Sequence, residues 1–322
     1  MIQDSVLVND WHAVASSTDV PEGSLLGVRL LDEYLVVWRM HGRLMAWQDL
    51  CVHRGTRLSL GAIEGENLVC GYHGWTYNTE GDCVSFPAHP EQKPPPKARV
   101  RTYKATERYG LIWVCLGEDE RGVPKFEEWE DGSFRKLLCG PYRYHASGPR
   151  AVENFLDVAH LPIVHSGLLG EREHAKIEDY QVETSRDGLI ARNVQIWQPD
   201  PDGTGVGKKV VYTYQVLRPL TMRLSKDAQE GRHAIFATVT PVGEIESVAW
   251  FWVAMNYALD TPEQEVVGFQ DTITSQDIPV VESQRPELLP LDLQAELHLR
   301  SDKMAVAYRK WLSQLGMTFG TA

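Results

Sequence analysis

The sequence contains no long apolar run. No stretch approaches the ~20 residues that a helix needs to span a bilayer, so we expect no transmembrane segment. The first residues, MIQDSVLVNDW, lack a basic start and an apolar core, so we expect no secretory signal peptide and a cytoplasmic location. Positive charge is scarce, since 32 Lys and Arg are set against 44 Asp and Glu, giving a net charge of −12. This balance argues against nucleic acid or an anionic membrane as a partner.

Cysteine is also scarce, with five residues in a chain of 322. Cys83, Cys115 and Cys139 show no spacing typical of a disulfide framework, so we expect them to be reduced and mostly buried. The chain lacks a GxGxxG fingerprint after a predicted strand, and it has no flavin or ferredoxin domain of its own. If the protein performs redox chemistry, its electrons must therefore come from another protein.

The most informative stretch is 51–75, which reads CVHRG at one end and CGYHGW at the other. It contains a CxH pair, Cys51 and His53, and a CxxH pair, Cys70 and His73, with sixteen residues between the pairs. Two thiolates and two imidazoles can bind zinc in a closed tetrahedral site, or a [2Fe–2S] cluster with Cys on one iron and His on the other. Each loop supplies one Cys and one His, and glycines beside the ligands let backbone N–H groups approach the sulfurs. Both features favour the cluster.

A second set of candidate ligands lies in the segment ENFLDVAHLPIVH, which contains Asn154, Asp157, His160 and His165. Asp157 and His160 are three residues apart and face the same side of a helix. His160 and His165 are five apart, which is about 140° on an ideal helix. Because Pro162 lies between them, we expect an i→i+5 π-turn that brings both imidazoles to one side. With one carboxylate, two such histidines form the facial triad of non-haem Fe(II) oxygenases.

The residues alone leave the third ligand open. The distal candidates lie on a helix predicted over Thr261–Ser283, and they are Asp271, Asp277 and Glu282. Asp157 is the nearer alternative. Asn154, one turn before Asp157, either hydrogen-bonds near the metal or caps the start of its helix.

The pattern of strands and helices predicts two domains in an α+β chain. Residues 1–118 alternate short strand patterns with turn signals, which indicates a small all-β domain carrying the two ligand loops. The acidic segment 119–131 is predicted to be a linker. Residues 132–322 predict a long antiparallel meander packed with helices. The helices are expected over Arg150–Val164, over Thr261–Ser283, and from near Ser301 to a stop at Gly316.

Three basic residues, Lys97, Arg99 and Arg101, alternate along a strand predicted over Ala98–Tyr103. Alternating residues of a strand share one face. The face is either simply solvated or a docking strip for an acidic electron donor. Substrate contacts are expected from the inner face of the second domain's sheet and from the 198–207 loop. His233, Met255 and Asn256 are the individual candidates.

The loops at 51–75 resemble a Rieske iron–sulfur motif. The pattern Asn154–Asp157–His160–His165 resembles the mononuclear-iron motif of Rieske non-haem iron oxygenase α-subunits, and the resemblance covers nearly the whole chain. The ending YRKWLSQLG resembles the branch that contains bacterial N-demethylases of methylxanthines and, more closely, the hydroxylases of saxitoxin biosynthesis. The stretches GLLGEREHAKIEDYQV and GMTFGTA are also similar to the latter group.

This resemblance implies a ligand set and an assembly. It implies a [2Fe–2S] cluster on the two Cys/His pairs and a mononuclear Fe(II) on His160, His165 and a distal aspartate. The surroundings of that aspartate resemble QDIPVVESQ, which identifies it as Asp277. Asp157 falls on the family's bridging carboxylate, which would join His160 to His73 of a neighbouring subunit. The family further implies a Rieske β domain, a helix-grip catalytic domain and a head-to-tail homotrimer.

The function implied is that of a terminal oxygenase, which inserts one oxygen of O₂ into a substrate C–H bond. The expected reaction is stereoselective hydroxylation of a small molecule that resembles a guanidinium alkaloid, with electrons from a separate NAD(P)H-dependent reductase or ferredoxin. If the attacked carbon is a methyl on nitrogen or oxygen, the outcome is demethylation, which is the alternative. An electron carrier without O₂ chemistry and a zinc-stapled alkaloid-binding protein are two further alternatives. A visible spectrum with metal analysis separates them.

Overall fold

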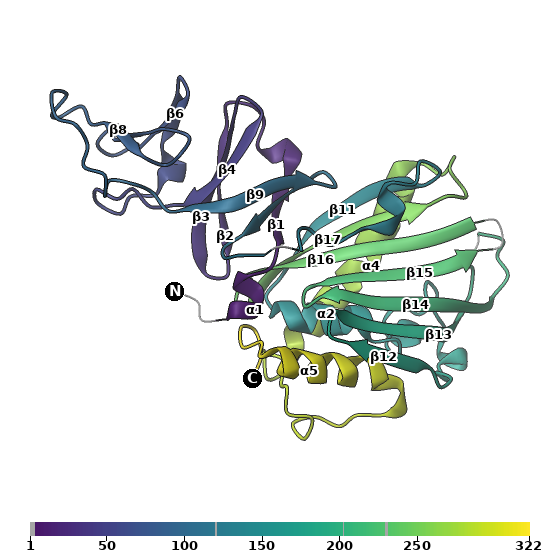
Figure 1. Cartoon of the computed structure of the whole chain (residues 1–322). Coiled ribbons are helices and arrows are strands. Elements are labelled where there is room, and N and C mark those ends of the chain that lie inside the picture. Colours follow the sequence, from purple (N-terminus) through teal and green to yellow (C-terminus); the bar gives the residue numbers. More distant parts are fainter. Residues whose placement is uncertain (1–3, 120, 202, 229–230) are drawn as a thin grey trace. The chain divides into compact units, whose positions relative to one another are not determined.

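The computed structural model describes residues 4–119, 121–201, 203–228 and 231–322. It divides into two compact units, Met1–Val123 and Pro124–Ala322, each built around antiparallel strands (Figure 1). The first unit is almost entirely β-structure, whereas the second is a sheet packed with helices. These features confirm the predicted α+β class. No helix within the described ranges combines the length and the apolar character needed to cross a membrane.

The first unit contains two antiparallel sheets. The larger sheet has the strand order β1-β10-β9-β4-β3-β2, and the smaller one has the order β5-β6-β7-β8. The strands of the larger sheet are β1 (His12–Ser16), β2 (Leu25–Leu30), β3 (Glu33–Met40), β4 (Arg43–Gln48), β9 (Thr102–Arg108) and β10 (Leu111–Cys115). The strands of the smaller sheet are β5 (Ala62–Glu64), β6 (Asn67–Val69), β7 (Thr76–Tyr77) and β8 (Cys83–Ser85). A short helix, α1 (Ser5–Val8), precedes β1.

The first Cys/His loop follows β4, and the second connects β6 to β7. Both cysteines belong to a core cluster that includes Trp38 and Trp47, whose rings pack edge to face with centroids 4.9 Å apart. Such an aromatic pair contributes roughly 0.5–1.5 kcal/mol beyond the burial of its area. The sulfur ends of the two loops are thus fixed by the apolar core of the unit.

The basic strip predicted around Arg99 is wrong as a strand face. β9 begins at Thr102, so residues 97–101 precede it, and Arg99 forms only an isolated bridge with Asp82. The guanidinium of Arg99 lies 3.4 Å from the Asp82 carboxylate and donates to the Glu80 carbonyl at 3.2 Å. A turn closed by the Ala98 N–H and the Pro95 carbonyl at 2.8 Å precedes this segment. The alternation of basic residues that the sequence suggested therefore does not fall on a regular strand.

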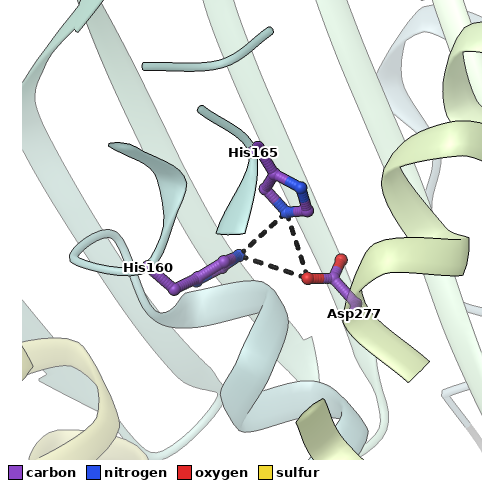
Figure 2. Close-up of side chains that lie close together, drawn as sticks. All are labelled: His160, His165 and Asp277. Carbon is purple, nitrogen blue, oxygen red and sulfur yellow. Dashed lines mark hydrogen bonds and ion pairs between the residues drawn. The ribbon is translucent and has the colours of Figure 1, made fainter. Parts of the chain in front are cut away.

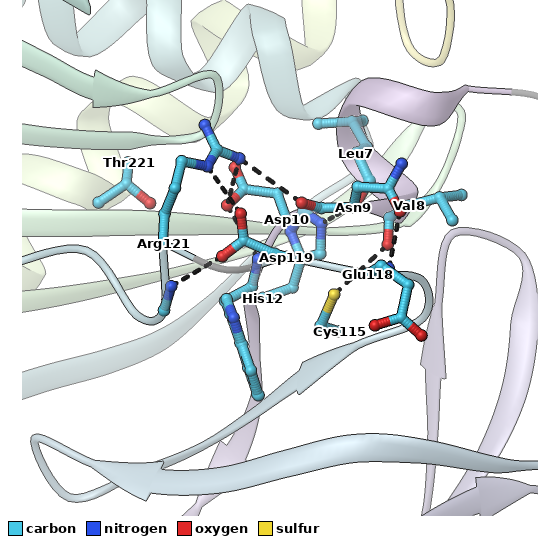
Figure 3. Close-up of polar contacts among 12 residues, drawn as sticks. Leu7, Val8, Asn9, Asp10, His12, Cys115, Glu118, Asp119, Arg121 and Thr221 are labelled. Atoms are coloured by element: carbon cyan, nitrogen blue, oxygen red, sulfur yellow. Dashed lines mark hydrogen bonds and ion pairs between the residues drawn. The ribbon is translucent and has the colours of Figure 1, made fainter. Parts of the chain in front are cut away.

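The end of the first unit is tied to its beginning by polar contacts (Figure 3). The side-chain oxygen of Asn9 accepts from the backbone N–H of Glu118 at 2.8 Å. The Arg121 guanidinium donates to Asp119 at 2.7 Å and to the Asn9 carbonyl at 3.5 Å. These bonds close the unit near the point where the chain leaves it.

The second unit is built on one seven-stranded antiparallel sheet with the order β11-β17-β16-β15-β14-β13-β12. Its strands are β11 (Arg135–Tyr144), β12 (Gln181–Ser185), β13 (Gly188–Gln198), β14 (Lys208–Arg218), β15 (Thr221–Ala228), β16 (Gly231–Gly243) and β17 (Glu246–Met255). Within the predicted linker 119–131, the residues from Pro124 onward belong to this unit, where Glu128 and Arg223 form a buried ion pair with an Nε–Oε2 distance of 3.1 Å.

Four α-helices accompany this sheet in the described ranges: α2 (Gly148–Leu156), α3 (Leu161–Val164), α4 (Glu263–Ser283) and α5 (Lys303–Leu315). α2 begins at a Ser147 cap, and α5 ends at Gly316, whose φ of 78° is the left-handed geometry that a glycine stop predicts. Buried charges join α2 to α5, since Arg309 binds Glu153 through two hydrogen bonds of 2.5 and 2.7 Å. Glu296 accepts from Arg150 at 2.9 Å and extends this network.

One predicted helix is wrong in an informative way. The segment Arg150–Val164 is not continuous, because α2 ends at Leu156 and Asp157 has an extended ψ of 123°. The chain turns and begins α3 at Leu161, with Pro162 in the first turn, where its missing N–H is no loss. The expected π-turn is therefore absent from this described segment, and the turn keeps ordinary i→i+4 bonds from Val164 to His160.

Candidate metal centres and substrate cavity

The two Cys/His loops adopt the same turn. The Cys51 N–H donates to the Thr56 carbonyl and the Cys70 N–H to the Trp75 carbonyl, both at 2.8 Å. In each loop the fifth residue is a glycine with positive φ, 71° at Gly55 and 70° at Gly74. Residues that carry a side chain rarely adopt that backbone conformation. These glycines therefore make the turns possible, in addition to giving backbone N–H groups room near the sulfurs.

The four candidate cluster ligands differ in exposure. Cys51 and Cys70 are each only 2% exposed, whereas His53 is half-buried and His73 is exposed. The two imidazoles lie side by side, with ring centroids 4.5 Å apart, and His53 stacks on Trp75 at 4.6 Å. The thiols therefore point into the protein and the imidazoles toward the surface. This separation of the two ligand types fits a two-iron unit with Cys on one iron and His on the other.

The polar surroundings of the sulfurs fit a metal cluster. The Tyr77 hydroxyl lies 3.1 Å from Cys51 Sγ. Burial raises the pKa of Cys70 and the adjacent Cys51 thiol raises it further, while the backbone N–H groups of Tyr72 and His73 lower it. A buried thiol whose pKa is raised, as that of Cys70 is, ionises readily only when a cation is near, and a coordinated metal supplies that charge. The donor set thus fits a [2Fe–2S] cluster.

The second candidate centre brings together His160, His165 and Asp277 (Figure 2). His160 precedes α3 and His165 follows it, so the two imidazoles stand at opposite ends of one helical turn. Their rings meet edge to face with centroids 5.0 Å apart. Asp277 reaches them from α4, more than a hundred residues further along the chain.

The three ligand atoms form a nearly regular triangle. Nε2 of His165 lies 3.0 Å from Asp277 Oδ1 and 3.2 Å from Nε2 of His160, and the third side is 3.4 Å. At metal–ligand bonds of about 2.1 Å, ligands at right angles are about 3 Å apart. The triangle therefore has the size of one face of an octahedral site, and all three of its residues line a cavity.

Hydrogen bonding sets the orientation of His165. Its Nδ1 lies 2.7 Å from Gln276 Oε1, and the amide oxygen can only accept, so Nδ1 carries the proton and Nε2 offers its lone pair to the triangle. The corresponding Nδ1 of His160 is buried without a hydrogen-bond partner among the described residues and lies 3.6 Å from Asp157 Oδ2. That distance is an ion-pair separation and too long for a hydrogen bond. The side chain of Asp157 is 39% exposed.

The electrostatics of this centre call for a cation. Burial lowers the pKa of His160, but the carboxylates of Asp157 and Asp277 outweigh it and raise the value to about 9. Burial raises the pKa of Asp277, and the two histidines more than reverse that effect. The side chains around the triangle therefore favour a positive charge within it, and a divalent metal can replace the imidazolium proton.

The remaining carboxylate candidates have other partners. Asp271 accepts from the Tyr142 hydroxyl at 2.6 Å, and Glu282 accepts from the backbone N–H of His145 at 2.8 Å. Asn154 does not cap its helix, because Ser147 does, and its amide Nδ2 lies 3.5 Å from Asp277 Oδ1. Of the two roles considered for Asn154, the geometry therefore leaves the one beside the triangle.

The triangle opens into a cavity of about 410 Å³. Much of its wall is apolar or aromatic, including Phe155, Leu161, Leu168, Tyr214, Phe251 and Ile273. His233 and Met255, two of the expected substrate contacts, line it, whereas the Asn256 side chain accepts from the Arg232 backbone N–H at 2.6 Å. Gln198, at the start of the expected 198–207 loop, lines the cavity as well. The sequence analysis did not single out Gln276, which contacts His165, or the lining residues Tyr212 and Lys226. Alternation in VVYTYQV was the available signal for Tyr212.

Comparisons with known proteins agree with this architecture in both units. A family model described as the Rieske [2Fe–2S] domain matches residues 10–104. A second, described as the vanillate O-demethylase oxygenase C-terminal domain, matches residues 144–317. The two matches together contain all nine residues that the sequence analysis singled out as ligands or catalytic groups.

Individual relatives span the chain. Methylxanthine N1-demethylase NdmA of Pseudomonas putida is 33% identical over 315 residues, which is 95% of this chain and 88% of the relative. The solved structure of Pseudomonas putida CBB5 NdmA with caffeine superimposes with a TM-score of 0.83 at 30% identity, covering 96% of this chain and 90% of that one. Oxidoreductase NdmD of Pseudomonas putida is 42% identical over 113 residues, which is 34% of this chain and 19% of NdmD.

Proposed function

The chain belongs to the Rieske non-haem iron oxygenases, and from this premise we propose that it removes a methyl group from a nitrogen or oxygen of a small heteroaromatic molecule. It is the terminal oxygenase component of that family, with a Rieske cluster and a mononuclear iron as cofactors. The main support for demethylation is the likeness to NdmA, which covers 95% of this chain. The match to the vanillate O-demethylase C-terminal domain supports the same class of reaction.

The proposed ligands of the cluster are Cys51, His53, Cys70 and His73. The burial of the thiols and the exposure of His73 support this assignment. Electrons must reach the cluster from outside through one side, while the other side of the cluster is shielded from water. The proposed ligands of the mononuclear iron are His160, His165 and Asp277, supported by the triangle of ligand atoms. We propose that Asn154 lies beside the iron ligand Asp277 and that its amide N–H donates to the carboxylate.

When bound, the iron supplies the oxygen-activating redox chemistry of the reaction. The balance is R–N–CH₃ + O₂ + 2e⁻ + 2H⁺ → R–N–CH₂OH + H₂O, after which the N–C bond breaks to give R–NH and formaldehyde. The chain's own residues provide the rest. The apolar wall excludes water, Gln276 holds the proton on His165 Nδ1, and α3 presents both imidazoles from a single turn.

We further propose that Asp157 relays electrons between subunits of a head-to-tail homotrimer. Its carboxylate faces His160 Nδ1 at 3.6 Å and is 39% exposed, so a second imidazole can approach it from outside. The partner imidazole would be His73 of a neighbouring subunit, which the exposure of that side chain allows. A carboxylate that accepts from two imidazole N–H groups would fix both tautomers.

The electrons are proposed to come from NAD(P)H through a separate reductase or ferredoxin. The likeness to oxidoreductase NdmD supports a redox protein of that kind as the partner. The alternative inferred from the sequence, hydroxylation of a guanidinium alkaloid, uses the same machinery but leaves the new oxygen on the product.

One assay tests the proposal. The metal-loaded protein is supplied with a surrogate reductase, NADH and O₂, together with caffeine, theobromine or a methoxybenzoate. We expect formaldehyde to form in a one-to-one ratio with O₂ consumed and demethylated product. An oxygenated product that retains all its carbon would refute demethylation, and electron transfer without O₂ uptake would refute the oxygenase. The His160→Ala variant serves as the control for reductase-driven background.

A further inference from the structure

The floor of the cavity is made of cross-strand rows of side chains. Tyr212 is paired with Lys226, Lys226 with His233, and His233 with Met255, across four neighbouring strands from β14 to β17. Residues directly opposite one another in antiparallel strands project from the same face of the sheet. All four members of this row line the cavity, and three of them are polar. In the next row, two residues along each strand, only Tyr214 carries a polar group.

Hydrogen bonds give the polar row a direction. Lys226 Nζ donates to Gln198 Oε1 at 3.3 Å, which fixes the orientation of that amide. Gln198 Nε2 then donates to the Tyr212 hydroxyl at 2.8 Å. Since the hydroxyl oxygen already accepts a hydrogen bond, the group still has its own proton to donate. Within the described ranges, no acceptor for that proton is found.

The two side chains joined by this last hydrogen bond, Gln198 and Tyr212, are both buried. Gln198 is 1% exposed and Tyr212 is 5% exposed, so neither can be satisfied by bulk water. A buried donor without an acceptor is destabilising, and native structures avoid such groups. The Tyr212 hydroxyl is therefore an O–H donor that awaits an acceptor in the cavity.

His233 adds a second unsatisfied group to the row. Neither of its ring nitrogens has a hydrogen-bond partner among the residues that the structure describes, and Nδ1 is fully buried. Burial lowers the pKa of His233 to about 3, and the charge of Lys226 acts in the same direction. The ring is therefore neutral and carries one N–H. Because an orphaned buried donor is rarer than an unmet acceptor, the Nε2–H tautomer is favoured, and it too presents a donor.

The polar row and the metal triangle lie toward different ends of the cavity. Arg135, the β11 partner of Met255 in the row, donates to the Leu259 carbonyl just before α4 begins. Further along β11, Tyr142 bonds Asp271, so α4 runs back across the sheet from the row toward Asp277. The cavity follows α4 from Glu265 to Asp277, which is about 18 Å at 1.5 Å per residue.

We propose that Tyr212 and His233 form a recognition site for an acceptor oxygen of the substrate, such as a ring carbonyl or a carboxylate. The inference rests on the proposed function only for the identity of the attacked carbon, which lies toward the triangle. The substrate class is then a mainly apolar molecule with an acceptor oxygen at the end remote from its methyl group. A guanidinium or amidinium group, which only donates, would meet two donors and the Lys226 ammonium there.

Four matched probes test this site: 4-methoxybenzoate, 4-methoxybenzamide, 4-methoxybenzamidinium and 4-methoxytoluene. Their binding to the metal-loaded, full-length protein is measured by calorimetry in the absence of reductase. We expect the benzoate and the benzamide to bind, and the amidinium to bind at least about tenfold more weakly than its isosteric carboxylate. Equal or tighter binding of the amidinium, or no binding of the two acceptor probes, would overturn the proposal.

The variant Tyr212→Phe should weaken 4-methoxybenzoate binding about tenfold and leave 4-methoxytoluene unchanged. His233→Leu should have the same selective effect, and it provides a second test if the first variant fails to fold. Tyr214→Phe is the matched control, because it removes a hydroxyl from the next row of the same cavity without touching the relay. A similar loss for all probes, or an equal change in selectivity in Tyr214→Phe, contradicts the assignment.

The outcome is separable from that of the demethylation assay. Acceptor-selective binding without formaldehyde release would leave the recognition site standing and refute the proposed reaction. Formaldehyde release from probes with no preference for an acceptor group would support the reaction and refute the site.

Discussion

The two candidate metal centres differ in where their ligands come from. The cluster ligands lie within 25 residues of one another, on two loops with the same turn, and all four can be read in one line of sequence. The triangle takes one ligand from each end of α3 and its third from α4, a helix distant in the sequence. The first centre is closed and half-exposed, with both histidines toward the surface, while the second is buried and opens into a cavity. In the proposed function, the local motif serves electron storage, and the long-range one serves chemistry that needs room for a substrate.

The sharpest test of this contrast is to remove the long-range ligand. In Asp277→Asn, the mononuclear iron should be lost, so that iron falls from about three to about two per chain and product formation stops. The brown colour and visible spectrum of the cluster should stay the same. Metal analysis and product assay provide the measurements. Asp271→Asn is the control, since that carboxylate binds Tyr142, and it should keep all its iron.

The next largest effect is expected where the two centres communicate. Asp157→Asn should leave both metal sites filled, because Asp157 is 3.6 Å from His160 Nδ1 and outside the triangle. Turnover with the surrogate reductase should fall by about 100-fold, at the upper end for a residue that orients a metal ligand. Single-turnover kinetics of a reduced sample would measure how much more slowly the variant forms product. Wild-type turnover in the variant would refute the bridge, and Asp187→Asn, in an exposed turn, controls for the change of charge.

A smaller effect is expected from the residue behind His165. Gln276→Leu removes the acceptor that holds the Nδ1 proton, and iron affinity should fall 10- to 100-fold. Gln276→Glu retains an acceptor at the same position and should bind iron nearly as well as the native chain. Iron titration of the two apoproteins makes the comparison. Equal affinities in both variants would show that the Gln276 contact does not orient the ligand.

The smallest effect is expected at the cluster. The hydroxyl of Tyr77 stabilises charge on Cys51 Sγ, and this charge is greater in the reduced state. Tyr77→Phe should therefore lower the reduction potential, by about 40 mV for a bond worth about 1 kcal/mol. A redox titration followed by electron paramagnetic resonance measures it. Tyr72→Phe is the control, since Tyr72 is exposed and beside His73, and no shift is expected.

The sequence predicted most where function depends on neighbours in the chain. The CxH and CxxH pairs and the long helix before Ser283 were readable from spacing and periodicity. The choice of Asp277 over Asp271 was not, because both lie on the same predicted helix and only family resemblance separated them. The packing of Asp271 against Tyr142 supplies a physical reason that spacing alone could not.

The error at the two histidines has a similar cause. Five residues on an ideal helix place two side chains far apart, so a π-turn was inferred to bring them together. The chain instead limits the helix to Leu161–Val164 and places one histidine at each end of it. His160 keeps helical angles, with φ −77° and ψ −24°, whereas His165 leaves them, with φ −105° and ψ 35°. Gln276 was overlooked because it is adjacent to Asp277 in sequence, and adjacent residues on a helix point about 100° apart. Both contact His165, one at each ring nitrogen.

The exposure of His73 has a practical consequence for work with the purified protein. In a chain that is not bound to a neighbouring subunit, the imidazole edge lies in water and is a short path for electrons in either direction. A dye or an electrode surface should then exchange charge with the reduced chain without any partner. Dissolved oxygen can accept electrons by the same route, which would oxidise the reduced cluster and produce superoxide. The protein should therefore stay reduced in an anaerobic chamber and be reoxidised quickly in air.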